Sequence, residues 1–137
     1  MPVVGFNFNK INVEKTGSIK GKINIGNDIA IKDVKERDLA FAGDKQKGVD
    51  FVFEFNAKYE PKAGHISLRG DVLFIDTAEK VKPILDSWKK NKQVPKDVMT
   101  SILNVALTKC NIQALILSQE INLPPPIPLP KVGVKKT

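Results

Sequence analysis

Residues 49–59 read VDFVFEFNAKY, and this stretch decides the fold. Apolar side chains occupy its odd positions and polar side chains its even positions, with Val52 as the exception. Such alternation is typical of a strand with one buried face and one face in water. The expected inner face of a sheet therefore carries Val49, Phe51, Phe53, Phe55, Ala57 and Tyr59.

The segments on either side of 49–59 predict further strands. Residues 60–64, EPKAG, predict a turn, and apolar side chains then recur on even positions from Ile66 to Phe74, which indicates an antiparallel partner strand. Upstream, residues 6–14 alternate first on even and then on odd positions, so we expect a β-bulge near Asn9 and Lys10.

The segment between these strands is less regular. Isoleucines on odd positions of 19–31 predict either one long bent strand or a hairpin. Acidic and basic residues then interleave, and we expect a solvated loop there, formed by Asp33, Lys35, Glu36, Arg37 and Asp38.

The period of the apolar pattern changes at Asp76. Asp76 and Glu79 have the spacing of a capping box, and apolar side chains then recur at helical intervals. Pro83 predicts a kink or a later start of this helix. The apolar residues expected to complete the core are Val72, Phe74, Val81, Leu85 and Trp88.

Pro95 suits the first turn of a second helix. Apolar residues cover much of the circumference of this helix, so we expect it to lie in the core or in a subunit interface. Residues 112–120 either continue the helix or are extended.

These patterns predict one α+β domain in residues 1–122, a size that suits a single core. Its parts are a twisted antiparallel sheet of about four strands in residues 5–75 and two C-terminal helices on one face, at 77–91 and 95–120. Residues 123–137 are expected to form a Pro-rich extended tail with a basic end, because five prolines in residues 124–130 exclude a helix.

The tail is more apolar than a plain linker, because Leu123, Ile127 and Leu129 alternate with prolines. Three interpretations stay open: packing along its own domain, docking on another subunit or partner, and disorder. The candidate partner-binding residues are Leu123, Pro124, Pro125, Pro126, Ile127, Pro128, Leu129 and Pro130.

The composition does not favour an enzyme. His65 is the only histidine and Cys110 the only cysteine. The chain therefore cannot form a metal cluster of several His and Cys ligands, and it has no second histidine or cysteine to choose from for a catalytic relay. We expect His65 to be an exposed strand-end residue and Cys110 to lie in the core. The sequence therefore predicts a non-enzymatic protein without a metal or a cofactor.

The chain carries 22 Lys and Arg against 15 acids, a net charge of +7, which favours RNA, an anionic surface or an acidic protein as partner. Arg37 and Arg69 are the only arginines, which is more typical of a lysine-rich solvated surface than of phosphate recognition. The alternative prediction is an RNA- or ribosome-associated protein. Its candidate contacts are Lys82, Lys89, Lys90, Lys92, Lys135 and Lys136.

The N-terminus lacks the pattern of a signal peptide, and the sequence shows no uninterrupted run of about 18 apolar residues. We therefore expect a cytoplasmic protein without membrane insertion. Abundant Lys, Ile and Asn suggest an AT-rich source.

The order of elements resembles that of the SecB export chaperones, of which archaea have small relatives. The resemblance covers strands in 6–75, helices from Asp76 onward, and a core helix that leads into residues 120–126, EINLPPP. It implies a dimer or tetramer that holds unfolded polypeptides in hydrophobic grooves without ATP. The bacterial chaperones are acidic whereas this chain carries +7, so the resemblance does not extend to their export partner.

Overall fold

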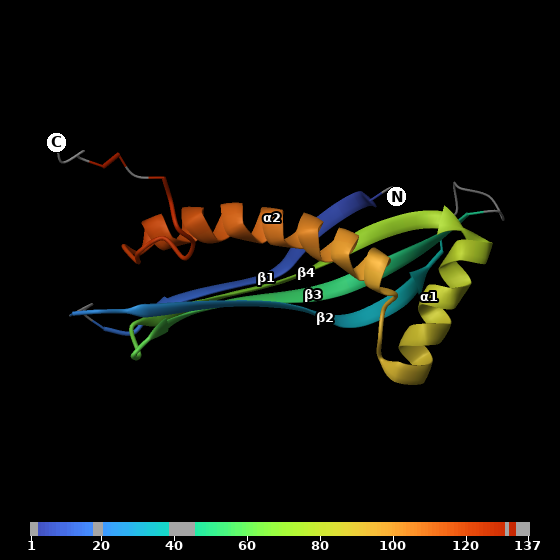
Figure 1. The fold of residues 1–137 in the computed structure, drawn as a ribbon, viewed down its shortest axis with the longest axis horizontal. Helices are drawn as coiled ribbons and strands as arrows, with labels where there is room; N and C mark the ends of the chain where they lie inside the picture. The colour runs from blue at the N-terminus through green and yellow to red at the C-terminus, as the bar shows by residue number, and fades with distance from the viewer. Residues whose placement is uncertain (1–2, 18–20, 39–45, 131, 134–137) are drawn as a thin grey trace.

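The computed structural model describes residues 3–17, 21–38, 46–130 and 132–133. The predicted α+β fold, a four-stranded antiparallel sheet followed by two C-terminal helices, is confirmed. Helix α2 runs along one face of the sheet, whereas α1, expected on the same face, lies at one end of it (Figure 1). The elements are β1 (Val3–Lys15), β2 (Asn24–Arg37), β3 (Gln46–Glu60), β4 (Gly64–Thr77), α1 (Ala78–Asn91) and α2 (Lys96–Glu120).

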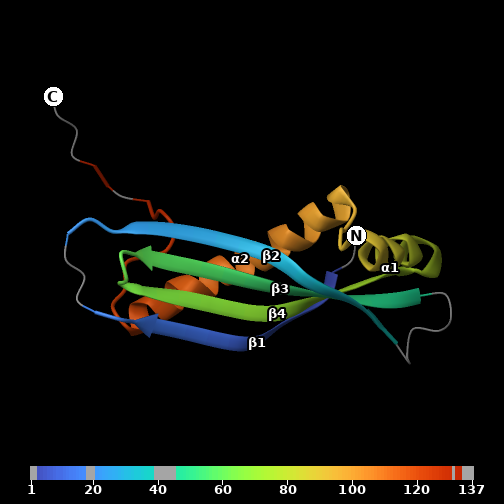
Figure 2. The same ribbon diagram turned by 90° about the horizontal axis from the view of Figure 1, so that it is seen from below.

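The strand order β1-β4-β3-β2 makes the sheet a Greek key. Strands β2, β3 and β4 are neighbours in sequence and in space, whereas β1 lies beside β4. The connection from β1 to β2 therefore leads from one edge of the sheet to the other, at the end where the β3–β4 turn lies (Figure 2). Consequently β1 and β2 are the two edge strands of the sheet.

Three register shifts interrupt the alternation along the edge strands. The expected bulge in β1 is confirmed, because the pairing with β4 shifts between Phe8 and Lys10, and a further shift lies near the start of β1 between Val3 and Gly5. In β2 the pairing with β3 shifts between Ile31 and Asp33. This shift moves the inward-facing side chains from odd positions to even ones, so that Val34 is buried.

The expected loop over Asp33–Asp38 is wrong, because β2 continues to Arg37. The interleaved charges are those of an exposed edge: Lys35 lies 3.7 Å from Asp33, and Arg37 lies 3.5 Å from Asp50 of β3. From Asn24 onward the preceding segment is one strand and not a hairpin. Residues 18–20, where that segment was expected to begin, lie outside the described residues.

The core fills the sheet face under α2. Phe51, Phe53 and Phe55 are all 0% exposed, as predicted. The ring of Phe53 stacks on Phe6 of β1 at a centroid distance of 5.3 Å. Gly70 of β4 makes room for this ring, because a Cβ there would lie 2.9 Å from Phe53 Cζ and would collide with the backbone oxygen of Asn7.

Helix α1 begins differently from the prediction. The capping box is wrong: Thr77 is the N-cap residue and makes no side-chain cap bond, while the Asp76 carboxylate accepts a hydrogen bond of 2.7 Å from the Thr77 backbone N–H. The later start is also wrong, since α1 runs from Ala78 and contains Pro83. Val81 is buried, and Leu85 and Trp88 are half-buried against the core.

Helix α2 begins at Lys96, directly after Pro95, and continues to Glu120, so residues 112–120 are helical. It crosses the strands diagonally (Figure 2). Its buried residues recur every fourth position, which is the row that faces the sheet: Val98, Ile102, Ala106, Cys110, Ala114 and Ser118.

Candidate binding surface

The apolar face of the sheet is incompletely covered along edge strand β2. Ile23, Ile29 and Ile31 are half-buried against the core, and Ile25 is 36% exposed. These four isoleucines are here called the β2 margin. Since α2 crosses the sheet diagonally, it covers the central strands more completely than this edge.

The outer edge of β2 has no strand partner among the described residues. Unpaired edges attract other chains, and charged side chains are one of the devices that prevent this. In β2 the charges gather at Lys32–Arg37, whereas Asn24–Ile31 carries only Asp28. The half of the edge beside the β2 margin is therefore the half open to pairing with another extended chain.

A turn after α2 directs the tail onto this region. Asn122 has a left-handed backbone with φ 58°. The backbone N–H of Leu123 donates to the Ser118 oxygen at 2.8 Å, and that of Asn122 donates to the Gln119 oxygen at 3.4 Å, which is the Schellman pattern of a helix end. Leu123 is buried as the apolar residue of this motif.

The tail then crosses the ends of β3 and β2 (Figure 2). The Tyr59 hydroxyl of β3 donates a hydrogen bond to the Pro124 oxygen, and the Asn27 amide of β2 donates one of 2.8 Å to the Pro126 oxygen. Burial raises the pKa of Tyr59 to about 12, which keeps the hydroxyl a donor even in alkaline solution. The tail thus borders the β2 margin next to Ile25.

The predicted tail residues divide into two groups. The structure places the first group against the chain's own domain: Leu123 and Pro126 are buried, and Pro124 and Ile127 are half-buried. The residues left exposed are Pro125, Pro128, Leu129 and Pro130. Sequence reasoning missed Asn27 and Tyr59, whose polar groups hold the tail; the one signal was that Asn27 is polar at an inner-face position between Ile25 and Ile29.

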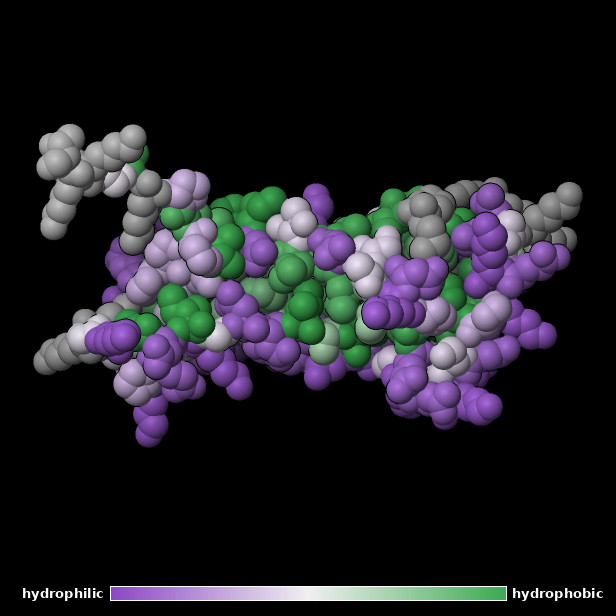
Figure 3. All heavy atoms as spheres, viewed as in Figure 1, coloured by the Kyte–Doolittle hydropathy of each residue, from purple (hydrophilic) through white to green (hydrophobic). Residues whose placement is uncertain are grey.

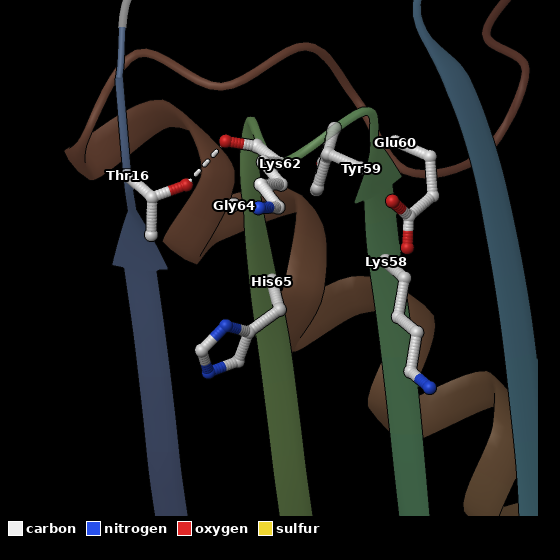
Figure 4. Close-up of a pocket in the computed structure, with 7 residues that line it drawn as sticks. All are labelled: Thr16, Lys58, Tyr59, Glu60, Lys62, Gly64 and His65. Atoms are coloured by element: carbon white, nitrogen blue, oxygen red, sulfur yellow. Dashed lines mark hydrogen bonds between the residues drawn. The ribbon is translucent and has the colours of Figure 1, made fainter.

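A hollow of about 480 Å³ lies at the β3–β4 turn (Figure 4). The Thr16 hydroxyl donates to the Lys62 backbone oxygen, and Gly64 is required because a Cβ there would collide with the Glu14 oxygen. His65 is half-buried, with its Nε2 atom 3.9 Å from a Glu14 carboxylate oxygen. The lining mixes cationic and acidic groups on an open surface: Thr16, Lys58, Tyr59, Glu60, Lys62, Gly64 and His65.

The described lysines of the RNA prediction lie on α1 and at its end, where acidic side chains interrupt them. Lys82 and Lys89 line a hollow of about 250 Å³ beside α1, together with the acidic Glu36 and Asp86. Lys92 lies over the Trp88 ring, 5.4 Å from its centroid, and Lys90 is exposed. Lys135 and Lys136 lie outside the described residues.

The polar face of the sheet brings two carboxylates together. Asp71 accepts a hydrogen bond of 3.0 Å from the Asn9 amide. Burial raises the pKa of Asp50, helped by the negative charge of Asp71, while Arg37 lowers it. No group of three or more metal-binding side chains occurs among the described residues.

Hydrophilic side chains dominate the side of the sheet that faces away from α2, which is the lower side in Figure 3. Apolar side chains lie along α2 and between α2 and the sheet.

Cys110 is buried in the row of α2 that faces the sheet, as predicted. Burial raises the pKa of its thiol to about 12. Since the thiolate is the reactive form, this environment favours an inert side chain.

Comparison of the chain with protein-family models, with curated proteins and with solved structures found no match. Among the described helices, α2 is long and apolar enough to cross a membrane by length and composition, with a mean hydropathy of 1.2 over 18 residues. A core helix of a soluble protein meets the same criterion, and one row of α2 is buried against the sheet.

Proposed function

We propose that this chain is a non-enzymatic, chaperone-like protein that holds extended segments of unfolded or partner polypeptides at the β2 margin. One observation carries the proposal: the half of an unpaired strand edge that carries a single charge, Asp28, coincides with incompletely buried isoleucines. The proposal includes the SecB-like role, a homo-oligomer and a cytoplasmic location.

Binding by strand addition follows from the chemistry of the edge. An extended client beside Asn24–Ile31 would exchange main-chain hydrogen bonds with β2, which requires no particular client sequence. Alternate client side chains would point toward α2 and contact Ile25 and Ile29. Apolar segments gain most from this contact, at about 25 cal/mol per Å² of apolar surface removed from water.

The tail borders this surface. Pro124 accepts a hydrogen bond from Tyr59, the pairing partner of Ile25, and Pro126 accepts one from Asn27, so a client would contact Ile25 alongside the tail. The described residues from Pro128 to Gly133 are exposed and could contact the client directly. Prolines suit such a border because they lack the backbone N–H that would let the tail itself pair as a central strand.

The test is suppression of aggregation of a chemically denatured protein, measured by light scattering. Ile25→Asp should reduce the protection because it places a charge on the β2 margin. Val4→Asp is the matched control: Val4 is also an exposed aliphatic residue on an edge strand, at the other edge of the sheet, and should leave protection unchanged. Failure of the unaltered chain to protect at a twofold molar excess would refute the proposal.

A form that ends at Pro126 separates the role of the tail from its packing. It keeps buried Leu123 and both hydrogen bonds to the tail, and it removes the residues from Ile127 onward. Reduced protection by a normally folded shortened chain would assign client contact to the exposed part of the tail. Unchanged protection would restrict the client site to the β2 margin.

RNA or ribosome binding remains the alternative prediction. Salt discriminates between the two, because log affinity for a duplex falls by about 0.9 per log unit of salt for each phosphate contact. Client binding through isoleucines should change little between low and moderate salt. Substituting Lys82 and Lys89 together would weaken RNA binding and leave protection intact.

A further inference from the structure

The face of α2 that points away from the sheet carries two exposed isoleucines. Ile112 is 54% exposed and Ile116 is 48% exposed. Each lies two residues from the buried row of Cys110, Ala114 and Ser118, which at 100° per residue is opposite the sheet.

These isoleucines belong to a stripe with a charge at each end. At 100° per residue, Lys109, Ile112, Ile116 and Glu120 fall within about 80° of one another around the helix. Lys109 is the only charged residue between Asp97 and Glu120. The order of the stripe is therefore cation, isoleucine, isoleucine, anion.

This order is complementary to itself when the helix direction is reversed. In an antiparallel pair that crosses near Ala114, Lys109 meets Glu120 of the second copy, and Ile112 meets Ile116. A parallel pair would place like charges together. An isologous two-fold contact repeats each pair twice, so a self-complementary stripe fits a second copy of the chain better than an unrelated partner.

A membrane surface fits the stripe less well. Helices that lie on membranes are rich in lysine or arginine on their polar face. Helix α2 instead ends in Glu120 and has Asn104 and Thr108 on its outward face. The described part of the tail crosses the ends of β3 and β2 and leaves past the β2 edge (Figure 2), and beside the end of α2 it rises away from the sheet (Figure 1).

We propose that the protein forms a two-fold dimer in which the α2 helices pack antiparallel. Ile112 contacts the partner's Ile116, and Lys109 pairs with the partner's Glu120. This inference deepens the oligomer of the proposed function by naming its partner and contact, and it does not require client binding.

The experiment measures mass by sedimentation velocity at concentrations from about 1 to about 100 µM, roughly the range in which such contacts associate. The full chain of 15.1 kDa should sediment as a dimer. Ile112→Asp should give a monomer with an unchanged circular dichroism spectrum, because Ile112 is largely exposed in the protomer.

Charge exchange tests the antiparallel register. Lys109→Glu or Glu120→Lys alone should raise the dimer Kd about tenfold, because each altered charge occurs twice in the contact. The double variant should restore the Kd to within about threefold. Lys96→Glu has the same charge change outside the stripe and should leave the Kd within about twofold.

The outcomes separate the two proposals. A monomer at about 100 µM, or a dimer whose mass does not change in Ile112→Asp, would overturn the α2 pairing. A monomer that cosediments with anionic vesicles through Ile112 would assign the stripe to a membrane surface instead. If Ile25→Asp stops suppressing aggregation but keeps the mass of a dimer, client binding is supported independently of the dimer. If Ile112→Asp is a monomer that still suppresses aggregation, the proposed function holds and belongs to the single protomer.

Discussion

Replacing Phe53 with alanine should destabilise the protein by about 3–5 kcal/mol, the range for truncating a buried phenylalanine. Phe53 is 0% exposed in the middle of β3, stacks on Phe6 at 5.3 Å, and lies near the edge of the Phe8 ring at 6.3 Å. Domains have about 0.05–0.15 kcal/mol of stability per residue, so a chain of this length has about 7–20 kcal/mol. The substitution therefore removes a large share of the total.

The assay is thermal unfolding followed by circular dichroism. At about 3–5 °C per kcal/mol for a domain of this size, Tm should fall by about 10–20 °C. Val4→Ala is the control: it shortens an aliphatic residue that is 53% exposed and should change stability by less than about 0.5 kcal/mol. An unchanged Tm for Phe53→Ala would refute the core assignment.

A double-mutant cycle between Phe6 and Phe53 isolates the aromatic contact. Stacked pairs contribute about 0.5–1.5 kcal/mol beyond the area that they bury. The double alanine variant should accordingly lose less stability than the sum of the single variants. Strict additivity would mean that the two rings do not interact in solution.

Three further predictions concern single groups in the fold. Gly70→Ala should destabilise by about 1–3 kcal/mol in denaturant unfolding, because the added Cβ meets the Asn7 backbone oxygen and the Phe53 ring; a neutral effect would mean that β1 can move away from β4. Cys110 should not react with a thiol reagent at pH 8 until the protein unfolds, because burial raises its pKa to about 12; rapid labelling of the folded chain would contradict the position of α2. Asp50→Asn should raise Tm at pH 7, since a carboxyl whose folded pKa is raised binds its proton more tightly when folded and is penalised while ionised. That advantage should shrink as the pH falls toward the ordinary pKa of 3.8, where Asp50 itself becomes protonated, and an advantage that grows on acidification would show that the sign is wrong.

Strands could be predicted from the sequence wherever apolar and polar residues alternate without interruption. Residues 49–59 and the strand after them pair along their whole length in the structure, and the change of phase in residues 6–14 correctly placed a bulge. The same reasoning failed at Asp33–Arg37, because the bulge after Ile31 comes just as charged residues begin. An exposed edge strand with mixed charges has the composition of a loop, and only its pairing with β3 distinguishes the two.

Long-range contacts could not be predicted from periodicity. The position of β1 beside β4 depends on pairing between segments more than 50 residues apart, such as Phe6 with Val72. The tail was left with three interpretations because its anchors are a hydroxyl on β3 and an amide on β2. Asn27 interrupts the isoleucines on the odd positions of its strand, but the sequence does not show which group its amide contacts, so the β2 margin and its border emerge only once the strands are assembled.

The distribution of side chain size on α2 argues for a second layer above it. In the middle and at the end of the helix, the row that faces the sheet consists of Ala106, Cys110, Ala114 and Ser118. These small side chains let the helix lie close to a sheet face that already carries the large rings of Phe53 and Phe55.

The larger aliphatic residues are therefore displaced to the flanks and to the outward face, where Ile112 and Ile116 reach water. A helix that served one sheet alone would place isoleucine inward and polar residues outward. Enlarging a residue of the inward row, as in Ala114→Leu, should consequently destabilise the fold by about 1–3 kcal/mol. Ile112→Asp, which places a charge on the outward face, should change only the mass of the assembly in solution. If both changes lowered Tm to the same extent in the monomer, the outward face would be part of the core of one protomer, and the case for a second layer would be lost.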